Sequence, residues 1–370
     1  MIEEARRAMQ DAMRDGWANP SSVHAPGRRS RALLEAARRA VAEELGARPA
    51  DVVLTSGGTE AVNLGVLRLG RGVSRVITTA VEHPAVAESV GRLESLGVEV
   101  WRAPVPNGVA PDASELADRI SADTLVAVQW VNHETGTMLP VPEWARAVRA
   151  RGARLFVDAT QALGVFPVDV VALGADAVAV ASHKIGGPGG AGALFVDRRW
   201  DIEPLLAGGA QERGRRPGAP DTPAQAGFGE ACRHLGHRRA RVAAASAARD
   251  RLEAYLIARG AVVNGAGAPR VPTVCNASVP SWSGQALVAA LDLEGLCASS
   301  GAACSSGLAE PSPVVGAMYP EEPWRAACAL RLSLGPETTD REVEGALSCL
   351  ERVLSRGPSR APSPDGRDNL

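Results

Sequence analysis

Between residues 28 and 200, short continuous apolar runs alternate with longer stretches of helical periodicity. Residues 52–54, 155–157 and 177–180 are such runs, and residues 28–45 and 141–151 have the spacing of amphipathic helices. A run without polar alternation indicates a strand that is covered on both faces. The alternation therefore predicts an α/β fold with a mainly parallel sheet, in which functional groups gather where strands end and helices begin.

The pattern changes after about residue 204. A glycine- and arginine-rich stretch predicts a long surface loop, and an alanine-rich stretch at about 224–259 predicts one long helix. A second mixed segment of helices and strands follows. These changes predict a large domain at residues 1–245, a smaller α+β domain at 246–355, and a disordered Pro- and Ser-rich tail at 356–370.

Composition excludes several classes of protein. The chain has 370 residues, 45% of them hydrophobic, which is enough for a sizeable buried core. Its formal net charge of −2, with interspersed acids and arginines, argues against a nucleic-acid or membrane surface. The charged N-terminal residues lack the apolar core of a signal peptide, so we expect a cytoplasmic protein. The six cysteines contain no C-x-x-C pair, which indicates free thiols rather than a disulfide framework or a zinc site.

Lys184, in "ASHKIGGPGG", is the only lysine among 40 basic residues. Arginine keeps its proton at any accessible pH, whereas a neutral lysine amine can condense with an aldehyde. One interpretation is therefore that this position requires an amine. The other is that the chain favours arginine through coding bias and this lysine is left by drift. Its place between a predicted strand and a glycine-rich loop favours the chemical role.

Two more motifs lie at predicted strand ends. Asp158, in "LFVDATQALG", is suited to pair with a protonated ring nitrogen of a cofactor, but an acid there also caps helices. Residues 56–59, Ser-Gly-Gly-Thr, join a strand to a helix and offer N–H groups and hydroxyls to a phosphate. The motif is neither a Walker loop nor G-x-G-x-x-G, so nucleotide binding fits poorly. Taken singly, a tight strand-to-helix turn with an N-cap explains it better.

Among the cysteines, Cys304 is the candidate reactive thiol. It lies in "ASSGAACSSGLAEPSP", a run of small polar residues that predicts an exposed loop. Cys297, Cys328 and Cys349 have apolar or helical surroundings and are expected to be packing residues.

The histidines give weaker signals. His83, in "TAVEHPAV", belongs to the carboxyl edge of the predicted sheet, although a lone histidine is more often structural than catalytic. His234 and His237 are three residues apart on a predicted helix, but no third ligand is evident, so we predict no metal site.

Taken together, these segments resemble the cysteine desulfurases, pyridoxal-phosphate (PLP) enzymes of the class V aminotransferase group. The shared stretches include "NPSSVHAPGR", "VLTSGGTEAVNL", "VNHETGT", "SHKIGGPGGAGALFV" and "SSGAACSSG", in the family's order, from about residue 18 to 350. The resemblance implies a fold type I PLP-dependent transferase that converts L-cysteine to L-alanine. It also implies a homodimer and a sulfur-acceptor protein, with iron–sulfur cluster assembly among the possible pathways.

The resemblance also implies roles for the matching residues. Lys184 would be the Schiff-base lysine and would remove the Cα proton of the substrate, Asp158 would pair with the pyridine nitrogen, and His83 would stack on the ring. Cys304 would accept the sulfur as a persulfide. Arg331 would bind the substrate carboxylate. The other implied cofactor contacts are Gln161 and His133 at the phenolic oxygen, and Gly58, Thr59, Ser182 and His183 at the phosphate.

The sequence departs from the family at four places. Family members begin with a short strand ending in Ala-Thr-Thr-Pro, and Met1 aligns beyond it, so either the start was assigned late or that wall of the site is absent. His133 replaces an asparagine, and we expect the histidine still to donate a hydrogen bond to the cofactor's oxygen. Ala181 replaces a serine, with Ser182 adjacent as a substitute, and Ala219 replaces a threonine. Two phosphate contacts worth about 1.5–3 kcal/mol each are thereby lost. We therefore expect PLP to dissociate readily on dialysis, and Ala219→Thr to tighten it.

Two alternatives remain beside a desulfurase. Another PLP reaction, such as a lyase or a transaminase, needs no acceptor thiol, so the Cys304 loop counts against it. A non-catalytic relative that binds a sulfur-transfer partner needs none of Lys184, Asp158 and Cys304, so their joint presence counts against that reading.

Overall fold

The computed structural model describes residues 1–301 and 310–357, so Cys304 lies outside the described residues. The chain forms two compact units. The first comprises residues 1–105, 109–133 and 137–243, and the second comprises 106–108, 134–136 and the chain from residue 244 onward.

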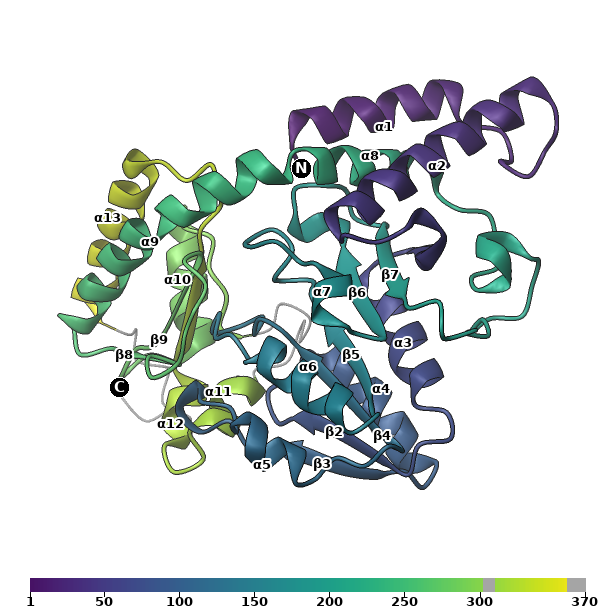
Figure 1. The fold of residues 1–370 in the computed structure, drawn as a ribbon. Coiled ribbons are helices and arrows are strands. Elements are labelled where there is room, and N and C mark those ends of the chain that lie inside the picture. The colour runs from purple at the N-terminus through teal and green to yellow at the C-terminus, as the bar shows by residue number, and fades with distance from the viewer. Residues whose placement is uncertain (302–309, 358–370) are drawn as a thin grey trace, which may run out of the picture. The chain divides into compact units, whose positions relative to one another are not determined.

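The first unit is built on a seven-stranded sheet with the order β1-β7-β6-β5-β4-β2-β3 (Figure 1). The run β6-β5-β4-β2-β3 is parallel, and β7 is antiparallel to both of its neighbours. The predicted mainly parallel sheet is therefore confirmed, with one antiparallel strand. The strands are β1 (Val52–Thr55), β2 (Arg75–Thr79), β3 (Glu99–Ala103), β4 (Thr124–Gln129), β5 (Arg154–Asp158), β6 (Ala177–Ala181) and β7 (Gly192–Val196).

Helices cover both faces of this sheet (Figure 1). α3 (Gly58–Leu69) and α4 (Pro84–Ser95) lie on one face, and α6 (Val141–Ala150) lies on the other. The two N-terminal helices, α1 (Glu3–Asp15) and α2 (Ala25–Glu44), both pack against α8 (Thr222–Arg233), which is distant in sequence. The shorter elements are α5 (Ala113–Ala117), α7 (Val170–Leu173) and the 3-10 turns η1 (Pro49–Asp51), η3 (Ser182–Lys184) and η4 (Gln211–Gly214).

Burial of the strands explains their apolar composition. Every residue of β4, β6 and β7 is buried. Because both faces of these strands are covered, apolar and polar residues do not alternate along them. Phe156 of β5 fills the space below α3, where a Cβ on Gly65 would come within 2.5 Å of the Phe156 ring. Glycine at position 65 therefore lets the helix approach the sheet closely.

The second unit contains a three-stranded antiparallel sheet with the order β10-β9-β8. Its core joins β9 and β10 to α9, α10 and α13 through apolar side chains such as Leu256, Leu287, Leu330 and Leu350. Its elements are η2 (Pro106–Gly108), β8 (Val262–Val263), β9 (Val274–Ser278), α10 (Gly284–Leu293), α11 (Pro313–Met318), α12 (Pro323–Ala327), β10 (Ala329–Ser333) and α13 (Asp340–Arg356), and α9 (Leu235–Ile257) begins in the first unit and ends in the second.

Two expectations about the segment after residue 204 need correction. The single helix predicted at 224–259 is two helices, because α8 ends at Arg233 and α9 begins at Leu235. Gly236 lies in the first turn of α9, where its low helix propensity weakens continuity. The predicted surface loop is partly buried, because Glu212 forms an ion pair with Arg38. Only 3% of the Arg38 side chain is exposed.

Among residues 1–301 and 310–357, no helix combines the length and the apolarity needed to cross a membrane.

Candidate active site

The candidate site is built at the carboxyl ends of neighbouring parallel strands. β4, β5 and β6 are adjacent, and the register pairs Gln129 with Asp158 and Asp158 with Ala179. β2 lies beside β4, and the loop that leaves β2 carries His83. Because parallel strands end at the same edge of a sheet, side chains that are far apart in sequence meet there.

His83 is the N-cap of α4. Its Nδ1 accepts a hydrogen bond from the N–H of Ala85 at 3.1 Å. Burial lowers the pKa of His83, the nearby Lys184 ammonium also lowers it, and the Asp158 carboxylate raises it. His83, Asp158 and Lys184 therefore lie close enough for their charges to interact.

Asp158 ends β5 and is 6% exposed. Its Oδ1 accepts a hydrogen bond from the N–H of Thr160 at 2.9 Å. Within the described part of the chain, no arginine forms an ion pair with this carboxylate. A buried carboxylate without an arginine partner fits the protonated ring nitrogen of a cofactor such as PLP.

Lys184 follows β6 directly, at the end of η3, and its side chain is exposed. His183, beside it, is also exposed, and burial of part of its ring together with the Lys184 charge lowers its pKa. This short turn presents both side chains at the same sheet edge as Asp158.

The predicted phosphate-binding motif, residues 56–59, lies at the start of α3, and we call it the phosphate cup. A Cβ on Gly58 would lie 3.2 Å from the Ala181 Cβ and 3.3 Å from the Thr160 Oγ1. The Ser182 hydroxyl instead lies against Gly187, and it is buried without a hydrogen-bond partner among residues 1–301 and 310–357. Ala181 and Thr160, rather than Ser182, are therefore the side chains that line Gly58. Thr59 is exposed on the first turn of α3.

Glu60 holds the loop that carries Ala219 against this cup. Its Oε1 accepts from Arg216 Nε at 2.9 Å, and its Oε2 accepts from the Ser56 N–H at 2.6 Å. Ala219 itself is exposed. The loop is thus fixed to the start of α3 by a half-buried ion pair.

The sequence did not single out Gln129, Glu82 or Thr160. Gln129 is 2% exposed, its N–H donates to the Glu82 carboxylate at 2.7 Å, and its Oε1 lies 3.3 Å from His133 Nδ1. The His133 and His83 rings meet edge to face, with centroids 4.9 Å apart. Burial raises the pKa of Glu82 to about 8, although hydrogen bonds from Thr79 and Gln129 oppose the rise. A polar residue at the end of an otherwise apolar strand was the available signal for Gln129.

The remaining predicted site residues are Gln161, Arg331 and Cys304. Gln161 is half-buried in the turn after β5. Arg331 lies in β10 of the second unit, and its Nη2 donates to the Ser299 hydroxyl at 3.2 Å. Cys304 lies outside the described residues.

The other cysteines differ in their exposure. Cys232 and Cys275 are buried, and burial raises the pKa of both thiols, that of Cys275 to about 12. Such thiols form little reactive thiolate. Cys349 is buried, as expected of a packing residue, whereas the same expectation for Cys297 is wrong because its side chain is exposed.

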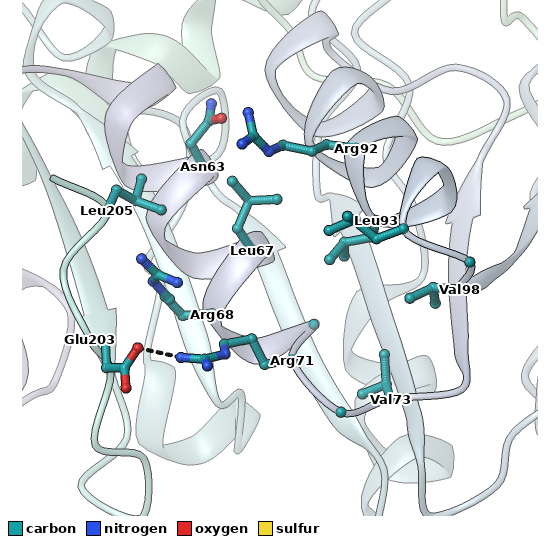
Figure 2. Close-up of a pocket in the computed structure, with 14 residues that line it drawn as sticks. Asn63, Leu67, Arg68, Arg71, Val73, Arg92, Leu93, Val98, Glu203 and Leu205 are labelled. Carbon is teal, nitrogen blue, oxygen red and sulfur yellow. Dashed lines mark hydrogen bonds and ion pairs between the residues drawn. The ribbon is translucent and has the colours of Figure 1, made fainter.

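A separate cavity of about 830 Å³ lies between the carboxyl ends of α3 and α4 (Figure 2). Arg68 donates to the Pro204 carbonyl, and Arg71 pairs with Glu203. Arg68 and Arg92 lie in the last turns of the two helices, where a positive charge complements the helix dipole. The candidate site is at the amino ends of the same helices, so this cavity is not part of it.

Comparison with known proteins decides the family. The aminotransferase class V family model matches residues 2–345. The chain belongs to the aminotransferase class V family. It is 37% identical to a cysteine desulfurase of Enterobacter agglomerans over 363 residues, which cover 96% of this chain and 90% of that protein.

Solved structures agree with this similarity. A NifS-like protein superimposes with a TM-score of 0.88 at 28% identity, covering 96% of each chain. SspA in complex with cysteine has a TM-score of 0.80 at 27% identity, covering 92% of this chain and 97% of the other. The predictions of a PLP-dependent transferase fold and of PLP-dependent cysteine desulfurase activity are thereby confirmed. The alternative PLP reactions are not favoured.

Proposed function

We propose that this enzyme binds PLP at the sheet edge formed by β4, β5 and β6, and that Cys304 carries the sulfur removed from L-cysteine. The observation that carries the proposal is the buried Asp158 carboxylate, which lies close enough to His83 to raise its pKa and has no arginine ion pair among the described residues. Full-length similarity to cysteine desulfurases supports the same reaction. When bound, PLP supplies an electron sink for negative charge that develops at the substrate's Cα.

The residues of this chain would hold PLP from several sides. Asp158 would keep the ring nitrogen protonated, and the His83 ring would lie against the cofactor ring. Gln161 and His133 would bond to its phenolic oxygen. The phosphate contacts proposed are the N–H groups at Gly58 and Thr59, His183 and, from the observed geometry, the Thr160 hydroxyl rather than that of Ser182.

Lys184 and Arg331 would act on the substrate. The Lys184 amine would hold the cofactor between turnovers, and once released it would take the Cα proton as a general base. Arg331 would bind the substrate carboxylate through its guanidinium, which matches a carboxylate with two parallel donors.

The sulfur transfer needs no external oxidant. The Cys304 thiolate would form a bond to the substrate sulfur while the substrate's Cβ–S bond breaks. The carbon keeps that electron pair and takes a proton, so cysteine and a thiol become alanine and a persulfide. An acceptor protein would then take the outer sulfur by thiol exchange.

We propose that the enzyme is a homodimer in the cytoplasm and that it passes sulfur to an acceptor protein. Iron–sulfur cluster assembly is one pathway that uses such a transfer. Relatives named IscS support this assignment of partner class.

The test is turnover by the purified protein with PLP and L-cysteine. We expect alanine in amounts equal to the sulfide released with excess dithiol, and loss of turnover in Cys304→Ala. Cys297→Ala is the matched control, because Cys297 is exposed and has no proposed role. Undiminished turnover in Cys304→Ala would contradict the role of Cys304.

A further inference from the structure

The Gln129 side chain has a defined orientation at the end of β4. Its Nε2 lies 2.5 Å from the Val81 carbonyl oxygen, which also accepts from Asn132 Nδ2 at 2.9 Å. A carbonyl only accepts hydrogen bonds, so the amide nitrogen, and not the amide oxygen, must face Val81. The Gln129 Oε1 is thereby left facing His133.

This orientation determines which nitrogen of His133 carries a proton. The His133 Nδ1 lies 3.3 Å from Gln129 Oε1, and an amide oxygen only accepts. Nδ1 must therefore be the donor. A neutral imidazole has one N–H group, so the Nε2 of neutral His133 carries a lone pair.

The neighbouring His83 has the opposite arrangement. Its Nδ1 accepts from the Ala85 N–H, so neutral His83 carries its proton on Nε2. His24 resembles His83, since its Nδ1 accepts from the Gly27 N–H at 3.2 Å. Two of the six histidines thus provide internal references for the reverse tautomer.

We propose that Gln129 is a positioning residue that fixes His133 as the Nδ1–H tautomer, so that neutral His133 offers the cofactor's phenolic oxygen an acceptor and not a donor. This inference rests on the proposed placement of His133 beside that oxygen. An asparagine, which the family resemblance places at this position, can offer an N–H group instead. The phenolic oxygen in this enzyme therefore keeps its proton more readily than with asparagine at position 133.

The first test uses full-length, cofactor-free protein labelled with 15N at histidine. Two-bond 1H–15N correlations distinguish the N–H nitrogen of each neutral imidazole from the nitrogen with a lone pair. His133→Asn identifies the His133 signals by their loss. We expect the proton on Nδ1 of His133 and on Nε2 of His24 and His83. A proton on Nε2 of neutral His133 would overturn the proposal, whatever any variant does.

The second test asks whether Gln129 is the cause. Gln129→Met keeps the unbranched length of the side chain but removes the acceptor, so the His133 proton should move toward Nε2. Asn132→Ala is the matched control, because it removes the other donor to Val81 and leaves the Gln129 Oε1 in place. If His133 keeps its proton on Nδ1 in folded Gln129→Met, Gln129 does not fix the tautomer.

The third test uses the absorbance of PLP bound to the protein, at a pH at which the 15N spectrum shows neutral His133. We expect a larger share of the short-wavelength band, which belongs to the protonated phenolic oxygen, in the wild type than in His133→Asn. Equal shares in the two proteins would contradict the effect on the cofactor. Failure of PLP to bind would contradict the proposed function and leave the tautomer result standing.

Discussion

The two ends of α3 and α4 present opposite chemistry. Their amino ends carry Gly58 and His83, beside a buried carboxylate and a lysine, in the candidate site. Their carboxyl ends carry Arg68 and Arg92 around an open cavity. At the carboxyl ends the arginines lie where a positive charge complements the helix dipoles, whereas at the amino ends the charges of His83, Lys184 and the buried Asp158 carboxylate lie close enough to interact. The grouping of these titratable side chains, more than cavity size, therefore marks the functional end.

Lys184→Arg, at the amino ends of the helices, should have the largest effect on turnover. A guanidinium cannot release its proton, so it can neither condense with an aldehyde nor act as a base. We expect turnover of L-cysteine to fall by at least about 10²–10⁴-fold, the usual contribution of general base catalysis, with an unchanged circular dichroism spectrum. Arg92→Lys, at the other helix end, should keep full turnover. Equal losses of turnover in the two variants would contradict a functional difference between the two helix ends.

Glu82→Gln tests whether the polar groups at the site end are held at a cost in stability. The folded-state pKa of Glu82 is about 8, above its ordinary value of 4.5, so its favourable contribution is complete below pH 4.5 and is lost as the pH rises to 8. Between pH 4.5 and 8, the free energy of unfolding of the variant should therefore rise relative to that of the wild type by up to about 1.4 kcal/mol for each pH unit. Urea unfolding at several pH values measures this difference, and a difference that is constant with pH would contradict the burial argument.

Thr160→Val and Ala181→Ser test the wall of the phosphate cup. Both side chains line Gly58, so the first change should weaken PLP binding and the second should strengthen it. A hydrogen bond to a charged group contributes about 1.5–3 kcal/mol, which corresponds to about 10- to 100-fold in the PLP dissociation constant. Ser182→Ala is the control and should change this constant little. A larger effect of Ser182→Ala than of Thr160→Val would reverse the assignment.

The smallest effect is expected at the cavity. The Arg92 side chain is exposed, and its guanidinium forms no hydrogen bond or ion pair within the described residues. Arg92→Ala should change the free energy of unfolding by no more than about 0.5 kcal/mol and leave turnover unchanged. A larger change in urea unfolding would show that the guanidinium at this helix end contributes more than a dipole interaction.

Sequence and structure agree best where a residue type is dictated locally. The apolar runs predicted the strands because β4 and β6 are buried on both faces, and Lys184 stood out because every other basic residue counted with it is an arginine. The Gln129–His133 contact and the Thr160 hydroxyl beside Gly58 depend on the sheet register and the turn after β5. Neither is encoded in a local pattern, so the sequence alone could not supply them.

The break between α8 and α9 and the buried Arg38–Glu212 pair were missed for a related reason. Alanine-rich sequence favours a continuous helix on propensity, and a glycine- and arginine-rich stretch is typical of a surface loop. Glu212 is drawn inward because it bonds to both Arg38 and the N–H of Leu54, residues far away in the sequence.

The central claim is that Lys184 holds the cofactor. Borohydride reduction of the PLP-loaded protein fixes the bond between an amine and the cofactor's aldehyde carbon, and peptide mass spectrometry then locates it. Because Lys184 is the only lysine, the modified amine is either that side chain or the N-terminus. We expect the pyridoxyl group on the peptide that contains Lys184. An unmodified Lys184 peptide, or a group on the N-terminal amine alone, would contradict the proposed site.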